Sequence, residues 1–220
     1  MITKNEEDYL KAIFHLTEEM EEEKAGVNQL ADYLNISPAS VTAMLKKLKV
    51  KEWVNYKRYG KIELTTQGKS IAVELIRKHR LWETFLYKCL NFRWDEVHEV
   101  AEQLEHIQSK KLIDQLEIFL GYPSRDPHGD IIPERDGTYR IRPKITLAEI
   151  GVGSKCRLMA VKDNSVAFLK YVADIGLALS SEIEVMDKRD FDGSMYIAFE
   201  GKQINISRKF AENVFVEEIQ

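Results

Sequence analysis

Cysteine is scarce in this 220-residue sequence, which contains only Cys89 and Cys156, far apart in the chain. No Cys-x-x-Cys pair is present, and this spacing does not favour a zinc ribbon, a dithiol redox centre or a disulfide framework. We expect each cysteine to be a small, buried apolar residue.

Long hydrophobic runs are also missing. No run approaches the length of a membrane span, and residues 1–5 lead directly into a charged amphipathic segment, not a signal peptide. With 44% hydrophobic and 31% charged residues, the composition is typical of a soluble globular chain that is long enough for more than one domain. We therefore expect a cytoplasmic protein with no membrane partner.

Charge of either sign is nearly balanced over the whole chain, which has a formal net charge of -4, but it is unevenly placed. Residues 25–80 contain 11 Lys or Arg against four acids, a local excess of +7, whereas residues 1–24 contain three Lys against eight acids. A basic segment within an acidic protein predicts contact with nucleic acid.

The basic segment carries the pattern of a winged helix-turn-helix. Apolar spacing predicts a short helix over 27–34, and Ser37 followed by Pro38 is a favourable start for a second helix. Two alternating segments, 53–56 and 62–65, predict strands that flank a basic turn. Helix, turn, helix and a two-stranded wing together indicate a DNA-binding domain.

The outward face of helix 37–49 suits a DNA groove. Small side chains near its start allow close approach to the major groove, hydroxyls can bond bases or phosphates, and long cations can contact phosphates. The alternative is a helical hairpin with a solvated lysine face. The residues that we expect to contact DNA are Ser37, Ala39, Ser40, Thr42, Lys46, Lys47 and Arg58.

A run of carboxylates and imidazoles follows at residues 98–106, which read His-Glu-Val-Ala-Glu-Gln-Leu-Glu-His. On a helix, steps of three and four residues return to the same face, so four of these side chains share one stripe. Carboxylates at successive turns repel one another, and a divalent cation placed between them converts repulsion into affinity. The stripe consists of His98, Glu102, Glu105 and His106. The alternative to a metal site is a solvated acidic helix face.

The remaining chain predicts further helices and then a β-rich end. We expect a long helix from residue 66, helices beginning near residue 94 and over 109–120, and a linker over 121–144, where prolines and glycines gather. Short strands are expected after that linker, at 155–161, 182–186, 195–199 and 203–207, with a small helix over 165–172.

These separated motifs, in this order, resemble the metal-dependent repressors of the diphtheria-toxin-repressor and manganese-transport-regulator type over nearly the whole chain. The matching segments are residues 7–11, the winged helix, 77–83, 97–106, the turn 127–129, and 147–153 with 175–177. The last two are similar to the FeoA type of small SH3-like β-barrel. The resemblance implies a mainly α fold with α+β parts: a winged helix-turn-helix over 1–72, a helical metal-binding and dimerisation domain with linker over 73–140, and an SH3-like β-barrel over 141–220.

The resemblance also implies the metal ligands. Asp8, Glu102, Glu105 and His106 match the primary site of the family, and His79, Glu83 and His98 match its ancillary site. We further hypothesise that His79, Glu83 and His128, with Asp126 or Asp163, bind a second cation. An equally supported alternative is that Asp126, His128 and Asp163 are turn and loop residues exposed to water.

The ligand types predict the metal. Relatives tuned to iron tend to place sulfur where this chain has Asp8 and Glu102, so oxygen and imidazole ligands favour Mn(II), with Fe(II) as the alternative. Some manganese regulators have a carboxylate at the position of Lys11, so a two-manganese cluster of that kind is not expected here.

We therefore predict a homodimeric, metal-activated repressor that binds a palindromic operator in double-stranded DNA and controls manganese or iron uptake genes. Two alternatives stay open, a metal-independent winged-helix regulator and, with less support, a metallohydrolase. We do not expect an enzyme, because no residue of the pattern stands out as a dedicated nucleophile or base.

Overall fold

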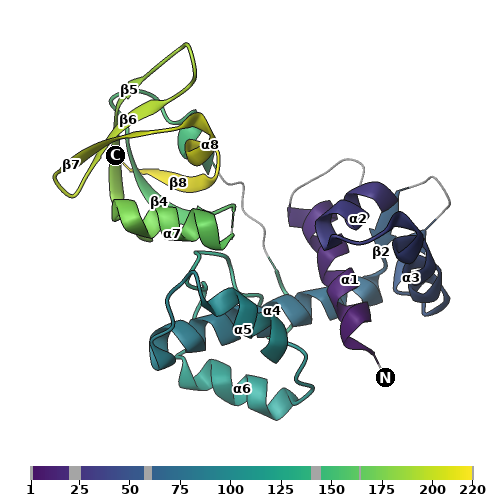
Figure 1. Ribbon diagram of the computed structural model, residues 1–220. Coiled ribbons are helices and arrows are strands. Elements are labelled where there is room, and N and C mark those ends of the chain that lie inside the picture. The colour runs from purple at the N-terminus through teal and green to yellow at the C-terminus, as the bar shows by residue number, and fades with distance from the viewer. Residues whose placement is uncertain (1, 20–25, 57–60, 140–144, 164, 220) are drawn as a thin grey trace. The chain divides into compact units, whose positions relative to one another are not determined.

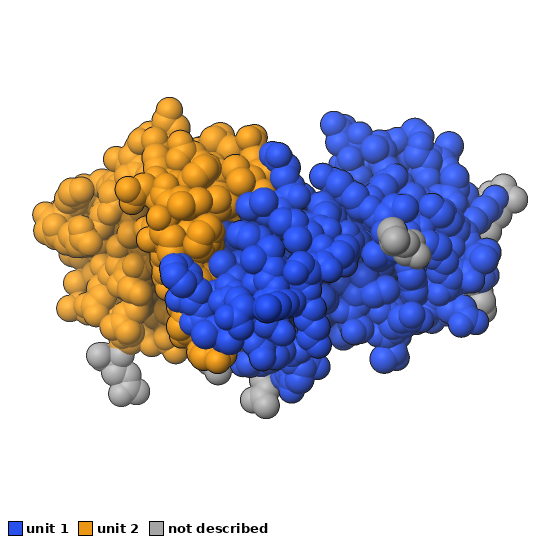
Figure 2. Space-filling view, turned by 90° about the horizontal axis from the view of Figure 1, so that it is seen from below, with its two compact units in different colours: residues 1–82, 101–119, 132–141 blue, residues 83–100, 120–131, 142–220 orange. Residues whose placement is uncertain are grey.

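The computed structural model describes residues 2–19, 26–56, 61–139, 145–163 and 165–219. The chain divides into two compact units (Figure 2). Unit 1 contains residues 1–82, 101–119 and 132–141, and unit 2 contains residues 83–100, 120–131 and 142–220. The boundary between residues 82 and 83 falls within the long helix α4 (Thr66–Leu90).

Unit 1 contains the winged helix-turn-helix. Its elements are α1 (Lys4–Phe14), the π-helical turn η1 (His15–Glu19), α2 (Val27–Leu34), α3 (Pro38–Val50), β1 (Val54–Tyr56) and β2 (Ile62–Leu64) (Figure 1). Strands β1 and β2 pair antiparallel, with Val54 opposite Leu64. The core beneath them is formed by side chains that are at most 1% exposed, among them Leu10, Phe14, Leu30, Leu45, Leu48 and Ile62. The predicted winged helix-turn-helix is confirmed.

The turn before α3 follows the sequence expectation closely. Asn35 ends α2 in the left-handed conformation, with φ of 53°, which asparagine tolerates better than most residues. The Ser37 hydroxyl then accepts a hydrogen bond from the Ser40 backbone N–H, and Pro38 occupies the first helical position. The start of α3 is thus determined by local sequence.

Helix α5 (Val97–Leu104) is shorter than the acidic run predicted, and helix α6 (Lys110–Phe119) follows it. The helix was expected to start near residue 94 and to include Glu105 and His106. Instead, both residues lie in the turn after Leu104, where the Glu105 N–H still bonds to the Ala101 carbonyl. Cys89, expected to be buried, is exposed near the end of α4, whereas Cys156 is buried.

Unit 2 contains the β-rich domain, a six-stranded antiparallel sheet of order β3-β8-β4-β5-β6-β7. Its strands are β3 (Ile145–Thr146), β4 (Lys155–Val161), β5 (Glu182–Lys188), β6 (Met195–Phe199), β7 (Lys202–Ile206) and β8 (Val214–Ile219). A 3-10 turn η2 (Leu147–Glu149), α7 (Val166–Ile175) and α8 (Arg208–Ala211) complete it. The predicted fold class is confirmed, although strands β3 and β8 were not predicted from the sequence.

The segment predicted as a linker packs tightly around Asp126, His128 and Gly129, all of which are buried. A side chain at Gly129 would place its Cβ 1.9 Å from the Met159 carbonyl oxygen, and the backbone there has φ of +88°. The His128 carbonyl accepts a hydrogen bond from the Val161 N–H. The turn is therefore part of the β-rich unit.

None of the helices in the described part of the chain combines the length and the apolar character that a bilayer crossing requires.

Candidate metal site and nucleic-acid interface

The first turn of α1 places an acidic side chain against the turn that follows α5. Glu7 and Asp8 both reach the imidazole of His106: Glu7 Oε2 lies 2.6 Å from Nδ1, and Asp8 Oδ1 lies 3.1 Å from Nε2. Glu105 Oε1 lies 3.7 Å from the same Nε2. The structure thus brings Asp8, Glu105 and His106 together, with one ligand atom from each within 4.8 Å of the others.

The hydrogen bonds of His106 leave one ring nitrogen aimed at oxygen. Glu7 holds the Nδ1 side, an arrangement that orients the imidazole and turns Nε2 towards Asp8. His106 Nε2 and Asp8 Oδ1 are both buried and make no hydrogen bond of good geometry. A divalent cation placed between them would bond to both atoms. These residues therefore fit a metal ion.

The charge balance of this cluster supports the same conclusion. Burial raises the pKa of Asp8, and the neighbouring carboxylates of Glu102 and Glu105 raise it further against the effect of His106. Glu105 is fully buried. Lys11 pairs with Glu102 and Glu105, while Glu7 and Asp8 contact His106, so carboxylates outnumber the cations that contact them and the cluster can accept additional positive charge.

The ammonium of Lys11 lies between the carboxylates of Glu102 and Glu105, next to the group just described. Its Nζ lies 2.7 Å from Glu102 Oε1, 2.7 Å from Glu105 Oε2 and 3.3 Å from His79 Nδ1. His79, Glu102 and Glu105 are themselves placed closely enough to hold a metal ion. Although burial opposes it, these carboxylates raise the pKa of Lys11, so the ammonium stays charged. Glu102, predicted as a primary ligand, thus pairs with Lys11.

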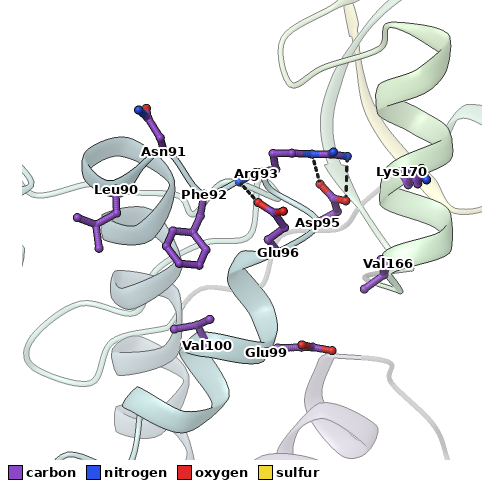
Figure 3. Close-up of a pocket in the computed structure, with 10 residues that line it drawn as sticks. All are labelled: Leu90, Asn91, Phe92, Arg93, Asp95, Glu96, Glu99, Val100, Val166 and Lys170. Atoms are coloured by element: carbon purple, nitrogen blue, oxygen red, sulfur yellow. Dashed lines mark hydrogen bonds and ion pairs between the residues drawn. The ribbon is translucent and has the colours of Figure 1, made fainter.

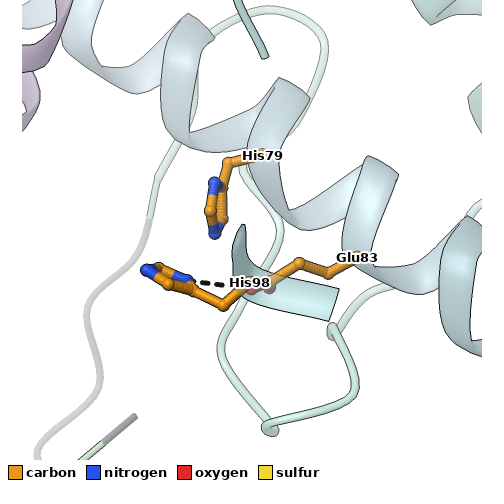
Figure 4. A group of neighbouring side chains, drawn as sticks. All are labelled: His79, Glu83 and His98. Carbon is orange, nitrogen blue, oxygen red and sulfur yellow. Dashed lines mark hydrogen bonds and ion pairs between the residues drawn. The ribbon is translucent and has the colours of Figure 1, made fainter. Parts of the chain in front are cut away.

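Of the predicted ancillary residues, Glu83 and His98 contact each other. On α4, His79 lies one turn before Glu83, as Figure 4 shows, and the ring of His79 pairs with Glu105 Oε2 at 2.5 Å. Glu83 Oε1 lies 3.3 Å from His98 Nδ1, the pair marked in Figure 4. The four stripe residues therefore do not share one site, because His98 pairs with Glu83 while the other three turn towards α1 and Lys11.

Glu83 also faces the turn from the predicted linker. Its Oε2 lies 3.5 Å from His128 Nδ1, and Glu83, Asp126 and His128 form a wholly buried group with metal-ligating geometry. Burial alone would lower the pKa of His128, but Glu83 and Asp126 raise it to about 9. Asp126 Oδ1 accepts hydrogen bonds from the His128 and Asp130 N–H groups, and the opposite ring nitrogen of His128 lies 2.7 Å from the Trp94 carbonyl.

Asp163 is half-buried and accepts a hydrogen bond from the Ser165 N–H. The groups of metal-ligating geometry that the described residues form do not include it.

A separate hollow of about 660 Å³ lies in unit 2 beside the start of α5 (Figure 3). Within it, Arg93 makes two hydrogen bonds of 3.0 Å to Asp95, and the Arg93 N–H bonds to Glu96. Its lining includes no predicted ligand, so it is separate from the groups above.

The face of α3 that is predicted to contact DNA is largely exposed. Ser37, Ala39, Ser40, Lys46 and Lys47 are exposed, and Thr42 is half-buried with its hydroxyl donating to the Pro38 carbonyl at 2.9 Å. Lys47 also pairs with Glu6 at 3.0 Å, so its charge is not wholly available to a phosphate. Arg58 lies outside the described residues.

Sequence reasoning missed Glu7 as a site residue. Glu7 is adjacent to Asp8 in the chain, and helical spacing gave no reason to place both against one imidazole. Gln108, whose amide donates to Glu7 Oε1 at 2.7 Å, was missed for the same reason. Their role depends on the approach of residues 106–108 to α1.

Family models match three consecutive segments of this chain. Residues 1–62 match the family described as "Iron dependent repressor, N-terminal DNA binding domain", residues 65–134 match its "metal binding and dimerisation domain", and residues 145–218 match the FeoA domain. The HTH-type transcriptional regulator MntR of Geobacillus thermodenitrificans is 33% identical over 126 residues, which are 57% of this chain and 87% of that protein.

Solved structures extend the match to the whole chain. One, a manganese-dependent transcriptional repressor in complex with manganese, is 33% identical, with a TM-score of 0.89 over 97% of this chain and 100% of that one. Another, ScaR with bound Cd²⁺, is 32% identical, with a TM-score of 0.83 over 98% of this chain and 100% of its own. This chain therefore belongs to the iron-dependent repressor family, of the diphtheria-toxin-repressor and manganese-transport-regulator type.

Proposed function

We propose that this protein is a manganese-activated repressor whose homodimer binds a palindromic operator and controls metal-uptake genes. The observation that carries the proposal is the group of Asp8, Glu105 and His106, in which Asp8 Oδ1 lies 3.1 Å from His106 Nε2 beside the buried carboxylate of Glu105. When bound, a divalent cation would supply the positive charge that this cluster lacks. A repressor of chromosomal genes acts in the cytoplasm.

The donor set favours Mn(II) over softer metals. Asp8, Glu105 and His106 offer oxygen and imidazole nitrogen, with Glu102 beside them, and no sulfur atom belongs to this group of described residues. Fe(II) shares these preferences and is the alternative. We expect this cluster to bind one cation and not two, because the ammonium of Lys11 already neutralises Glu102 and part of Glu105.

A second cation site is proposed around Glu83, with ligands drawn from His79, His98, Asp126, His128 and Asp163. Glu83, Asp126 and His128 support it most directly, since all three are buried and face one another within unit 2. A metal ion there would hold the 126–129 turn against α4, and the β-rich domain packs on that turn through Gly129.

The DNA contacts are proposed for α3. Ser40 is exposed near the capped start of this helix, and Lys46 is exposed further along it. A homodimer is supported by apolar side chains on α6 that have water contact in this chain, Leu112 (40% exposed), Ile118 (44%) and Phe119 (69%). Two symmetric winged domains match a palindromic operator.

Fluorescence anisotropy with labelled DNA tests the activation. An operator is first selected from a random-sequence pool by the manganese-loaded protein, and its affinity is then measured with Mn(II), Fe(II) under anaerobic conditions, or excess chelator. We expect tight binding with metal and at least ~10-fold weaker binding with chelator. Asp8→Asn should abolish the metal response, whereas Asp32→Asn, an exposed acid of α2, should retain it. Undiminished binding in chelator would favour a metal-independent regulator.

Isothermal titration calorimetry tests the second site. Wild type should bind two Mn(II) per subunit, and a variant with His128→Ala and Asp163→Ala should bind one. His15→Ala is the matched control, since this histidine pairs with Glu19 outside the clusters. One cation per subunit in wild type, or two in the double variant, would exclude the second site.

A further inference from the structure

Three consecutive carboxylates near the start of α1 contact two different parts of unit 1. Glu7 and Asp8 reach His106, as described above, whereas Glu6 reaches α3. Successive side chains of an α-helix point about 100° apart, so one rigid turn can contact two structural elements at once. The turn that carries the metal ligand Asp8 therefore also contacts the DNA-facing helix.

The Glu6 carboxylate is divided between two tasks. Its Oε2 accepts a hydrogen bond from the Thr3 N–H at 2.9 Å, which completes the capping box of α1. Its Oε1 lies 2.7 Å from Lys51 Nζ and 3.0 Å from Lys47 Nζ. The side chain is fully buried, which is unusual for a glutamate in the first turn of a helix. Capping needs one oxygen and does not need the two lysines.

Both lysines belong to the DNA-recognition element. Lys47 lies on α3 among the residues proposed to contact DNA, and Lys51 is the residue that ends this helix. The Lys51 ammonium also lies 4.7 Å from the centre of the Trp53 ring, just before the wing strand β1. Glu6 therefore holds the C-terminal end of α3 and the approach to the wing.

We infer that Glu6 is a positioning residue that couples metal binding at Asp8 to the orientation of the recognition helix α3. This inference rests on the proposed function, because it assigns the route by which the metal site regulates DNA binding. A cation that restrains Asp8 restrains the first turn of α1, and Glu6, two residues earlier, transmits that restraint to Lys47 and Lys51. Burial makes the link stiff, since a displaced Glu6 would leave an unpaired charge.

The test compares Glu6→Gln with wild type. Glutamine keeps the capping oxygen but loses the charge that holds the lysines. The matched control is Glu18→Gln, which removes another carboxylate of the winged-helix unit, one that pairs with Lys69 away from α3. Two quantities are measured: the ratio of operator affinities with and without Mn(II), and the hydrogen-exchange protection of α3 amides on adding Mn(II) without DNA.

In wild type and Glu18→Gln we expect Mn(II) to raise both quantities. In Glu6→Gln the affinity ratio should fall at least ~5-fold and the added protection of α3 should disappear. Mn(II) affinity without DNA should stay within ~2-fold, because Glu6 does not face the ligand cluster. An unchanged ratio in Glu6→Gln, with wild type still metal-dependent, would overturn the inference alone. A wild type with no metal dependence would overturn the proposed function as well.

Lys51→Gln removes the same ion pair from the side of α3. Position 51 tolerates replacement better than position 6, because the Lys51 side chain is 31% exposed. Lys51→Gln should lower the affinity ratio in the same direction, and the Glu6→Gln, Lys51→Gln double variant should lose less than the sum of the two. Should Glu6→Gln fail to fold, Lys51→Gln decides by itself, and a retained ratio overturns the inference. Fully additive losses would do the same.

Discussion

At the scale of single residues, Lys11 neutralises part of the negative charge between α1 and α5. Its ammonium lies within hydrogen-bond distance of Glu102 and Glu105, in a group whose other member is His79. A tethered charge of this kind performs part of what a bound cation would do, because it offsets the repulsion between the carboxylates. The residue type at position 11 was readable from the sequence, whereas its three partners were not.

Lys11→Glu should add one Mn(II) to the stoichiometry of each subunit. The substitution replaces an ammonium by a carboxylate beside His79, Glu102 and Glu105, so a divalent cation becomes the favourable occupant. Calorimetric titration measures the change, with Lys88→Glu, at the exposed end of α4, as the control of equal charge difference. Unchanged stoichiometry in Lys11→Glu would contradict the role given to this lysine.

Glu19 is the second residue whose environment carries a prediction. It accepts from Arg80 at 2.9 Å and from the Tyr139 hydroxyl, and it lies 2.7 Å from His15 Nδ1. Burial would raise the pKa of Glu19, but His15, Arg80 and Tyr139 hold it well below its usual value of 4.5. The network ties η1 to α4 and to the segment that returns from the linker.

The sign of the pH effect follows from this depressed pKa. The unfolded chain takes up a proton on Glu19 below about pH 4.5 and the folded chain does not, so the stabilisation is complete above that pH and is lost as the pH falls. Glu19→Gln should lower the free energy of unfolding at pH 7 by about 2 kcal/mol and reduce the further loss at pH 3.5. Urea denaturation of the metal-free protein measures both. Glu18→Gln should keep the wild-type loss between the two pH values, and an equal loss in Glu19→Gln would argue against the network.

At the scale of elements, the 126–129 turn shows how a segment of linker composition becomes part of a folded unit. The prolines and glycines of this segment predicted a linker. Position 129 requires glycine, because a side chain there would collide with the backbone of β4. The same close approach buries Asp126 and His128, which brings them to Glu83. The glycine therefore decides whether these side chains are exposed or can act as ligands.

Gly129→Ala should destabilise the β-rich unit by about 2 kcal/mol or more, because it adds a clash to an unfavourable backbone conformation. Gly153→Ala is the matched control, since Gly153 has nearly the same φ, +83°, in the same unit and nothing within 4 Å of the added carbon. It should cost about 1 kcal/mol. Thermal unfolding compares the two, and equal losses would mean that backbone strain alone determines the cost.

At the scale of the whole molecule, a metal that binds the folded chain must also stabilise it. At a free Mn(II) concentration of 100 times the dissociation constant, the primary site should add about 2.7 kcal/mol to the free energy of unfolding. Urea denaturation with Mn(II) or with chelator measures this gain. Asp8→Asn should lose most of it while Asp32→Asn keeps it, and a gain that survives in Asp8→Asn would place the tightest metal elsewhere.

The sequence alone determined the local features of this protein. Ser37-Pro38 predicted the start of α3, alternating apolar residues predicted the wing, and the spacing of the acidic and histidine residues indicated a metal site. The resemblance of the separated motifs to a known family indicated a metal-activated repressor. These signals are short-range, because capping, turn formation and helix periodicity depend on residues within a few positions of one another.

Only the tertiary structure decided which of those residues act together. It separated His98 from the stripe, placed Glu7 behind His106, set Lys11 between Glu102 and Glu105, and joined Glu6 to the end of α3. Helix spacing predicts which side chains share a face of a helix, but not which other element packs against that face. Each of these pairings crosses between segments distant in sequence, so it depends on how the buried faces pack and on which charges that packing leaves to be neutralised.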